Sequence, residues 1–254
     1  MRTLKTTLII VLALVAAPCT SQENDKSQAF WVHEDVVKPS MVSEYETVCK
    51  ELTDNMKKHN IQEMNSIVAN LADNRYLWVG PIENMAQLDK PLFATLAEKM
   101  GAEKMGALFD RMDKCYDIEQ NYIIHLDKDL SYMPGGITQT PEGQDYRKFH
   151  YFHYAPGNRA IVKKKVEAIK NLFTSKGSKL DYRVYRSGFG TRGEFYMVAI
   201  AAKDAADYAN KISANNELMG EEWLKTYTDF TSTLEKYEAF EGNMRPDMAY
   251  TPGE

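Results

Sequence analysis

The chain has 254 residues and a formal net charge of −5 at pH 7, with 26% charged and 44% hydrophobic residues, fractions that are ordinary for a globular protein. The negative balance disfavours nucleic-acid binding, which requires a basic face, and the basic run 163–165 is expected on a solvated helix face. We therefore predict no nucleic-acid partner.

The N-terminal segment has the pattern of a secretory signal peptide. Two basic residues precede an apolar run over 8–17, and small residues follow it. The run is too short to span a bilayer, and no later run is long enough, so no transmembrane segment is predicted. We predict a signal peptide over 1–21 and an exported, periplasmic or secreted protein. Lipid attachment at Cys19 is the alternative.

The first half of the mature chain is predicted to contain strands and helices in a defined order. Aromatic and β-branched runs predict the strands, and apolar residues at helical spacing predict the helices. In chain order these are a strand over 29–37, a helix over 41–56, strands over 66–71 and 76–79, a helical region over 84–119 and a strand over 122–127.

The second half repeats this order after a segment rich in proline and glycine, which is typical of a linker. Its predicted elements are a strand over 148–154, a helix over 160–175, strands over 180–187 and 194–201, a helical region over 205–237 and a strand over 240–245. We predict a first structural unit over 28–132, a linker over 133–146 and a second unit over 147–250.

Residue types also recur between the halves. Tyr122, Leu126 and Pro134 are matched 118 positions later by Phe240, Met244 and Pro252. Near the start of each half, Trp31 and His33 are matched 120 positions later by Tyr151 and His153. This self-similarity predicts a tandem duplication.

Each half therefore has the order β-α-β-β-α-β, which is the ferredoxin-like arrangement. Both helices of such a unit cover one face of its sheet, and the open face must be buried elsewhere. The predicted fold class is α+β, with two ferredoxin-like β-α-β-β-α-β units that turn their open faces together as a pseudo-symmetric α/β barrel.

The element order, the divided second helix and the repeat resemble the dimeric α/β-barrel superfamily over residues 29–250. That superfamily includes antibiotic-biosynthesis-type monooxygenases, NIPSNAP-like proteins, stress-responsive barrel proteins and chlorite dismutase-like haem proteins. The resemblance implies a barrel fold and allows either ligand binding or cofactor-independent oxygenation. Asn216 and Trp223, seven apart on one helix, are loosely similar to residues that such oxygenases use.

Alternation along the strands predicts which side chains face the barrel interior. In the closing strands, the apolar residues Tyr122, Ile124 and Leu126 are expected beneath the helices, so the polar residues between them point inward. We predict His33 and His153 as catalytic bases. The predicted ligand-binding residues of the same interior are Trp31, His125, Asp127, Tyr151, Glu241, Asn243 and Arg245.

A polar interior has two explanations. It can hold water or a ligand, or its groups can satisfy one another, for example by pairing Arg245 with Glu241 or Asp127. The sequence therefore predicts a small-molecule binder that uses the barrel interior. The alternatives are a cofactor-independent monooxygenase-like enzyme and a non-catalytic interaction protein with a closed barrel, and a homo-oligomer is compatible with each.

Cofactor signatures are weak. His33, His125 and Asp127 could converge, but no HxH or HExxH spacing supports a metal site. Chlorite dismutase-like proteins ligate haem through a histidine of their second unit, whereas His150 and His153 both lie on its first strand. We therefore predict no metal and no cofactor. Cys49 and Cys115 are expected to be buried free thiols.

Overall fold

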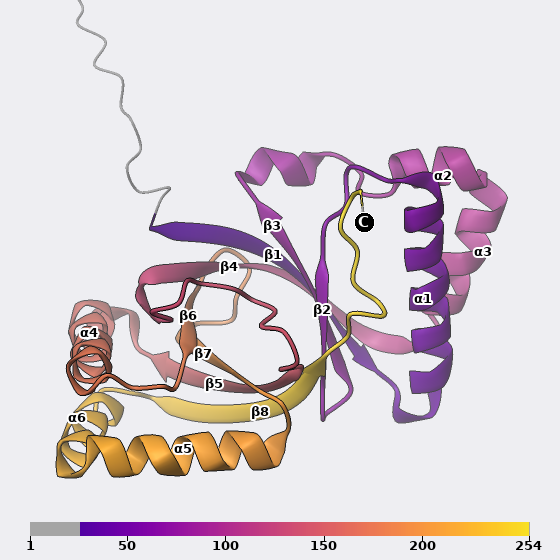
Figure 1. Ribbon diagram of the computed structural model, residues 1–254. Coiled ribbons are helices and arrows are strands. Elements are labelled where there is room, and N and C mark those ends of the chain that lie inside the picture. The colour runs from indigo at the N-terminus through magenta and orange to yellow at the C-terminus, as the bar shows by residue number, and fades with distance from the viewer. Residues whose placement is uncertain (1–25, 254) are drawn as a thin grey trace, which may run out of the picture.

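The computed structural model of the protein describes residues 26–253 (Figure 1), so the predicted signal peptide and Cys19 lie outside the described residues. Each half of the described chain has the order strand, helix, two strands, two helices, strand. The strands are β1 (Ser27–Val37), β2 (Ile67–Leu71), β3 (Arg75–Ile82), β4 (Tyr116–Tyr132), β5 (Tyr146–Tyr154), β6 (Tyr182–Ser187), β7 (Glu194–Ala202) and β8 (Lys236–Met244). The helices are α1 (Val42–His59), α2 (Ala94–Met100), α3 (Ala102–Met112), α4 (Arg159–Lys176), α5 (Ala205–Met219) and α6 (Glu221–Thr231), with short 3-10 turns at Pro39–Met41, Met85–Asp89 and Pro156–Asn158.

All eight strands form one closed antiparallel barrel in the order β1-β3-β2-β8-β5-β7-β6-β4. The predicted fold class, with two ferredoxin-like units packed face to face, is wrong. The reason is that the edge strands pair across the halves, β2 with β8 and β4 with β6, so a single hydrogen-bonded sheet closes on itself. Where β2 pairs with β8, a Cβ on Gly242 would overlap the carbonyl oxygen of Asn70, so this pairing requires glycine.

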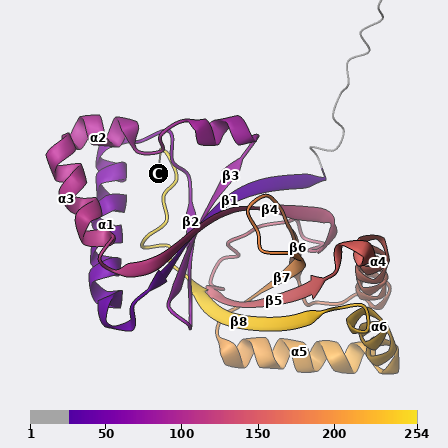
Figure 2. The same cartoon turned by 180° about the vertical axis from the view of Figure 1, so that it is seen from behind.

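The helices form two groups on opposite sides of the barrel, as both views show (Figures 1 and 2). Helices α1–α3 pack against β1–β3 and the start of β4, and α4–α6 pack against β5–β7 and the end of β4. Helix α1 buries Tyr45, Val48, Cys49, Leu52 and Met56 at helical spacing against the sheet. Cys49 and Cys115 are both buried and free, as predicted. None of the helices in residues 26–253 is long and apolar enough to cross a membrane.

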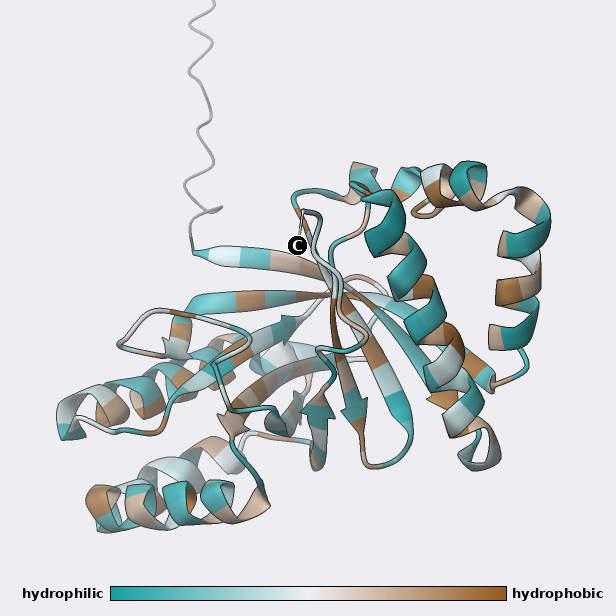
Figure 3. Ribbon diagram, turned by 45° about the vertical axis from the view of Figure 1, so that its right-hand side comes forward, coloured by the Kyte–Doolittle hydropathy of each residue, from teal (hydrophilic) through white to brown (hydrophobic). Residues whose placement is uncertain are grey.

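The middle of the barrel interior is an apolar core, and charged side chains lie towards its two ends. Figure 3 shows how hydrophobic and hydrophilic residues alternate along the strands that build it. Its cavity has a volume of only about 50 Å³, room for little more than water. The interior side chains include Phe30, Val32, Ile124, Leu126, Phe149, Tyr185 and Met197.

The faces that we expected for β4, the last strand of the first half, are therefore reversed. Ile124 and Leu126 point into the barrel, where we expected polar groups, and Tyr122 packs against the same cluster. The physical reason is that side chains must fill a closed eight-stranded barrel. The outer faces of the strands are only partly covered by helices, so polar residues are tolerated there.

Candidate functional site

Within residues 26–253, two of the cavities between the barrel and its helices are candidate sites. The His33 pocket has a volume of about 310 Å³ and lies between the outer face of β1 and helices α1–α3. The aromatic cavity has a volume of about 230 Å³ and lies between β5–β7 and helices α4–α6. Both are large enough for a small organic molecule, unlike the packed barrel interior.

The polar wall of the His33 pocket is built by two neighbouring strands. Trp31, His33 and Asp35 alternate along β1 and so share its outer face. In the register with β4, His33 lies opposite Asn121 and Asp35 lies opposite Glu119. The apolar part of the lining comes from the neighbouring strands and from the helices and loops that cover them, and consists of Leu52, Trp78, Phe93, Phe109, Met112 and Tyr116.

A chain of hydrogen bonds holds the buried carboxylate of this wall. Trp78 Nε1 donates to Tyr45 Oη at 3.0 Å, and Tyr45 Oη donates to Asp35 Oδ2 at 2.6 Å. The other oxygen, Asp35 Oδ1, lies 3.2 Å from His33 Nε2, and the Asp35 side chain is only 1% exposed. Because a buried carboxylate requires compensation, this chain fixes the position of Asp35 and pairs it with His33.

The other side of the imidazole faces an oriented amide. His33 Nδ1 lies 3.0 Å from Asn121 Oδ1, which also accepts a hydrogen bond from Trp31 Nε1 at 3.1 Å. Asn121 Nδ2 donates to Glu119 Oε1 at 3.0 Å, and this fixes which end of the amide faces His33. Both ring nitrogens of His33 therefore face oxygen acceptors.

These contacts set the protonation of His33. Burial by itself lowers the pKa of His33. Hydrogen bonding to Asp35 and Asn121 and the charges of Asp35 and Glu119 outweigh burial, so the pKa is raised above its ordinary value of 6.5. A histidine of this kind can take or give a proton near neutral pH at the wall of a cavity.

The same wall offers ligand atoms for a cation. One atom each from His33, Asp35 and Glu119 lie within 4.8 Å of one another. An imidazole with two carboxylates suits a divalent ion such as zinc or manganese. From the sequence we considered His33, His125 and Asp127 as possible ligands and predicted no metal site; of these three, only His33 belongs to this group.

The aromatic cavity has a different lining. Tyr208, Trp223, Tyr227 and other apolar side chains surround it, and Asn216 also reaches it. The Tyr182 hydroxyl is buried and has no hydrogen-bond partner among the residues that the structure describes. An unpaired buried hydroxyl is costly, so this group is suited to hydrogen-bond a ligand.

His150 lies at the edge of the aromatic cavity with a tyrosine on each side. Its Nδ1 lies 2.7 Å from Tyr237 Oη, and its Nε2 lies 3.0 Å from Tyr208 Oη. Burial, with a smaller contribution from the charge of Lys148, lowers the pKa of His150 to about 4. The ring is therefore neutral at pH 7, and the cavity has no charged pair comparable to His33 and Asp35.

The structure separates residues that we predicted to lie together. Trp31 and His33 face helices α1–α3, not the barrel interior, whereas Tyr151 packs against the interior cluster. The alignment at 120 positions therefore does not preserve the face of the strand, because the interior side chains of β1 are Phe30 and Val32, not Trp31. A shift of one residue moves every side chain to the other face of a strand.

Other predicted residues lie at the rims and seams of the barrel. His153 Nε2 lies 3.0 Å from Glu238 Oε2. Asp127 accepts a hydrogen bond from the backbone of Leu130 and pairs with Arg186, whose charge, after burial, helps lower the pKa of His125. Glu241 accepts hydrogen bonds from Tyr146 and Lys148, and Asn243 is exposed on β8. Their roles in ligand binding stay predictions.

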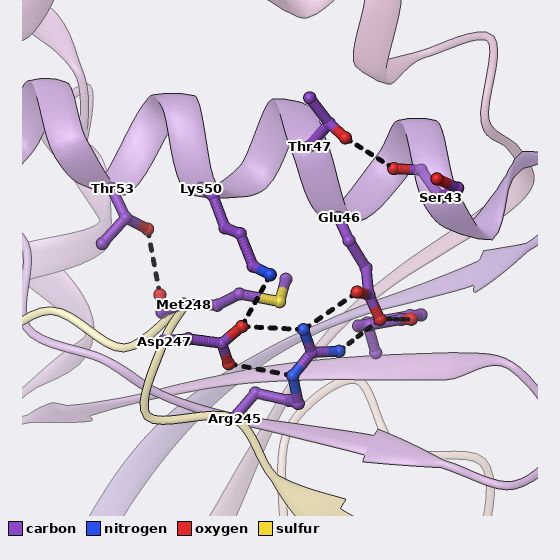
Figure 4. Close-up of polar contacts among 9 residues, drawn as sticks. Ser43, Glu46, Thr47, Lys50, Thr53, Arg245, Asp247 and Met248 are labelled. Carbon is purple, nitrogen blue, oxygen red and sulfur yellow. Dashed lines mark hydrogen bonds and ion pairs between the residues drawn. The ribbon is translucent and has the colours of Figure 1, made fainter.

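Arg245 holds the C-terminal segment to helix α1 (Figure 4). Its guanidinium forms paired hydrogen bonds with Glu46, including Nη2 to Oε2 at 2.9 Å, and two more with Asp247 at 2.9 Å each. Hydrogen bonding to Arg245 is the main reason that the pKa of Asp247 is lowered. Lys50 Nζ adds an ion pair to Asp247 at 2.9 Å. We predicted that Arg245 would pair with Glu241 or Asp127, but its partners are Glu46 and Asp247.

Sequence reasoning missed Asp35, Asn121 and Tyr45. Asp35 had a usable signal, because the alternation Trp31-x-His33-x-Asp35 places all three side chains on one face of a strand. Asn121 and Tyr45 had none, because their positions depend on the β1–β4 register and on the packing of α1.

The comparisons with known proteins bear on the fold. No family model matches the chain, and no curated protein matches it in sequence. An anthrone oxidase-like protein superposes with a TM-score of 0.58 at 12% identity, covering 91% of this chain and 95% of its own. A candidate monooxygenase from Lactobacillus acidophilus NCFM gives 0.54 at 9% identity, covering 89% and 97%. A candidate chlorite dismutase gives 0.50 at 10% identity, covering 87% and 96%.

At such low identities the similarity shows the fold alone. The chain shares its overall fold with the anthrone oxidase-like protein and the candidate monooxygenase, so the resemblance to such proteins is confirmed at the level of the fold alone. The tandem duplication and the NIPSNAP type are not confirmed.

Proposed function

We propose that the protein binds a small organic molecule in the His33 pocket. The observation that carries this proposal is the hydrogen-bond chain Trp78–Tyr45–Asp35–His33, which ends at the wall of a 310 Å³ cavity. A pre-organised polar group beside an apolar wall is the usual composition of a ligand site. The pocket favours a binder or an enzyme over an interaction protein, which requires no cavity.

The lining suggests the chemistry of the ligand. Trp78, Phe93 and Phe109 offer an apolar, aromatic wall, and His33 and Asn121 offer one polar edge. This arrangement suits a flat, largely apolar molecule with a single hydroxyl, carbonyl or other weakly acidic group, which would lie against His33.

Tryptophan fluorescence tests binding directly, because Trp31 and Trp78 line the pocket. We expect anthrone to quench the fluorescence of the wild-type protein saturably and His33→Gln to weaken the apparent affinity about tenfold. His150→Gln is the matched control in the aromatic cavity and should bind as the wild type does. Equal weakening in both variants would place the ligand elsewhere.

The His33–Asp35 pair favours one further function, a cofactor-independent oxygenase. Neutral His33 would remove a proton from an acidic C–H group of an electron-rich substrate, and Asp35 would stabilise the resulting imidazolium. The carbanion would then reduce dioxygen; for anthrone, one molecule of O₂ gives anthraquinone and water. Asn216 and Trp223 line the other cavity, so that cavity is the competing location.

Oxygen uptake tests this step. We expect one O₂ consumed for each anthrone converted and a loss of about 10²-fold or more in rate for His33→Gln. Binding without uptake would leave the binder and remove the enzyme. Loss of uptake in His150→Gln alone would move the reaction to the aromatic cavity.

We also propose that the protein is exported through its predicted signal segment over 1–21. The support is the sequence pattern alone. The intact mass of the mature protein distinguishes cleavage after Ser21 from lipid attachment at Cys19, and light scattering on the same sample determines whether it forms a homo-oligomer.

A further inference from the structure

Two buried arginines lie together at one end of the barrel. Arg147 on β5 and Arg183 on β6 are 1% and 2% exposed. Arg147 pairs with Ala201 and Arg183 pairs with Ala199, both on the intervening strand β7. Both arginines therefore lie on the face of the sheet that lines the barrel interior.

Neither arginine has a carboxylate partner. Arg147 donates to the backbone carbonyl oxygens of Gln139, Gln144 and Tyr146, and Arg183 donates to that of Thr138 at 2.7 Å. No ion pair within 4.0 Å involves either guanidinium among residues 26–253. Carbonyl oxygens satisfy the N–H groups but supply no negative charge, so two buried positive charges stay uncompensated.

The opposite end of the barrel provides an internal contrast. There, Arg75 Nη1 lies 3.6 Å from Glu34 Oε1, and Tyr122 donates to Glu34 Oε2 at 2.9 Å. Arg75, whose side chain is 17% exposed, therefore has a carboxylate partner of its own. Repulsion between the two arginines adds to burial in lowering the pKa of Arg147 to about 10, as expected where the counter-charge is missing.

A cavity of about 200 Å³ adjoins the uncompensated pair. Arg183 lines it, and its Nε is buried without a hydrogen-bond partner in the described part of the chain. The other charged residues of the lining are Lys179, Lys211 and Asp181, so positive charge exceeds negative. Lys211 is already paired with Asp207 at 2.8 Å and donates to Gln144 Oε1 at 2.8 Å.

We propose that this cavity, the arginine cavity, binds the oxyanion group of a small molecule, a phosphate or a carboxylate, through Arg183 with Lys211 at its side. Guanidinium groups match the geometry of both groups and form strong charge-assisted hydrogen bonds with them. The arginine cavity is separate from the His33 pocket, so this site is independent of the function proposed above.

Thermal unfolding of the whole protein in different anions tests the proposal. We expect inorganic phosphate or succinate to raise the Tm above its value in chloride of equal ionic strength, because a ligand that binds only the folded state stabilises it. Calorimetry should then give one site for each chain. If neither anion acts beyond chloride, the proposal is wrong.

Variants locate the site. Arg183→Gln should weaken the binding of the effective anion about tenfold or more, and Lys211→Gln should weaken it less. Lys165→Gln is the matched control, because it removes the same charge from an ion pair with Asp229 outside the arginine cavity. If Arg183→Gln does not fold, Lys211→Gln decides. Responses equal to that of the control in every folded variant would overturn the proposal.

Discussion

The His33 pocket and the aromatic cavity occupy equivalent positions beneath the two groups of helices, yet their chemistry differs. The outer face of β1 presents Trp31, His33 and Asp35, whereas that of β5 presents His150, Phe152 and Tyr154. The first set includes a buried carboxylate beside a histidine of raised pKa, and the second includes a neutral histidine between tyrosines. The fold thus determines where a cavity forms, and a few residues on one strand determine its chemistry.

The two histidines provide the strongest test of this contrast. His33→Leu leaves the buried Asp35 carboxylate without its imidazole partner and should lower the free energy of unfolding by about 3–5 kcal/mol. His150→Leu removes a neutral ring whose tyrosine partners are partly exposed, so it should cost about 1 kcal/mol or less. Urea unfolding of both variants measures the difference. Equal losses would show that the two sites are not chemically distinct.

Two tyrosines sharpen the comparison. Tyr45→Phe leaves Asp35 Oδ2 and Trp78 Nε1 without their partner and should cost about 2–3 kcal/mol. Tyr182→Phe removes a hydroxyl that has no hydrogen-bond partner within residues 26–253, so the free energy of unfolding of the ligand-free protein should be unchanged or slightly higher. The same unfolding experiment compares them. A large loss in Tyr182→Phe would mean that its hydroxyl is satisfied, for example by bound water.

The sequence predicted the elements better than it predicted their faces. The order of strands and helices follows from hydrophobic spacing and turn residues, and it matches the structure in both halves. Alternation alone cannot say which face of a strand is inside, because both faces of β1 are largely covered. The sequence also did not predict that the sheet closes, because the pairing of β2 with β8 joins residues far apart in the chain.

Because the elements were predicted correctly but their faces were not, only part of the predicted site lies together in the structure. His33 and Trp31 are close together and line a cavity, although on the opposite side of the sheet from the one expected. Arg245 was expected to contribute to the interior because it continues the alternation of β8. The strand ends at Met244, so that alternation no longer applies to Arg245.

Arg245 also distinguishes the two groups of helices, because it ties the C-terminal segment to α1 and thus to the cover of the His33 pocket (Figure 4). Arg245→Met should lower the free energy of unfolding by about 1–2 kcal/mol, since Glu46 and Asp247 are partly exposed and can be hydrated. Amide hydrogen exchange should quicken in α1 and stay unchanged in α4. Lys165→Met, which breaks an exposed ion pair beside α6, is the control.

The smallest effects should appear in the pH dependence of stability. Titration of His33 and titration of His150 should change the free energy of unfolding in opposite directions as the pH rises. The raised pKa of His33 means that the folded state binds its proton more tightly than the unfolded chain does. Its contribution to stability is therefore complete below pH 6.5 and is lost as the pH rises through the folded pKa. His150 has a pKa lowered to about 4, so stability is lost instead as the pH falls from 6.5 towards 4.

Proton NMR titration of the two imidazoles measures both values directly. We expect His33 to titrate above 6.5 and His150 far below it. Asp35→Asn should lower the pKa of His33, because it removes the hydrogen bond and charge that outweigh burial, and should leave His150 unchanged. The same substitution should extend any His33-dependent oxygen uptake to lower pH, because the base is active when neutral. A His33 that titrates below 6.5 in the wild type would mean that burial dominates in both cavities, and the chemical contrast between them would disappear.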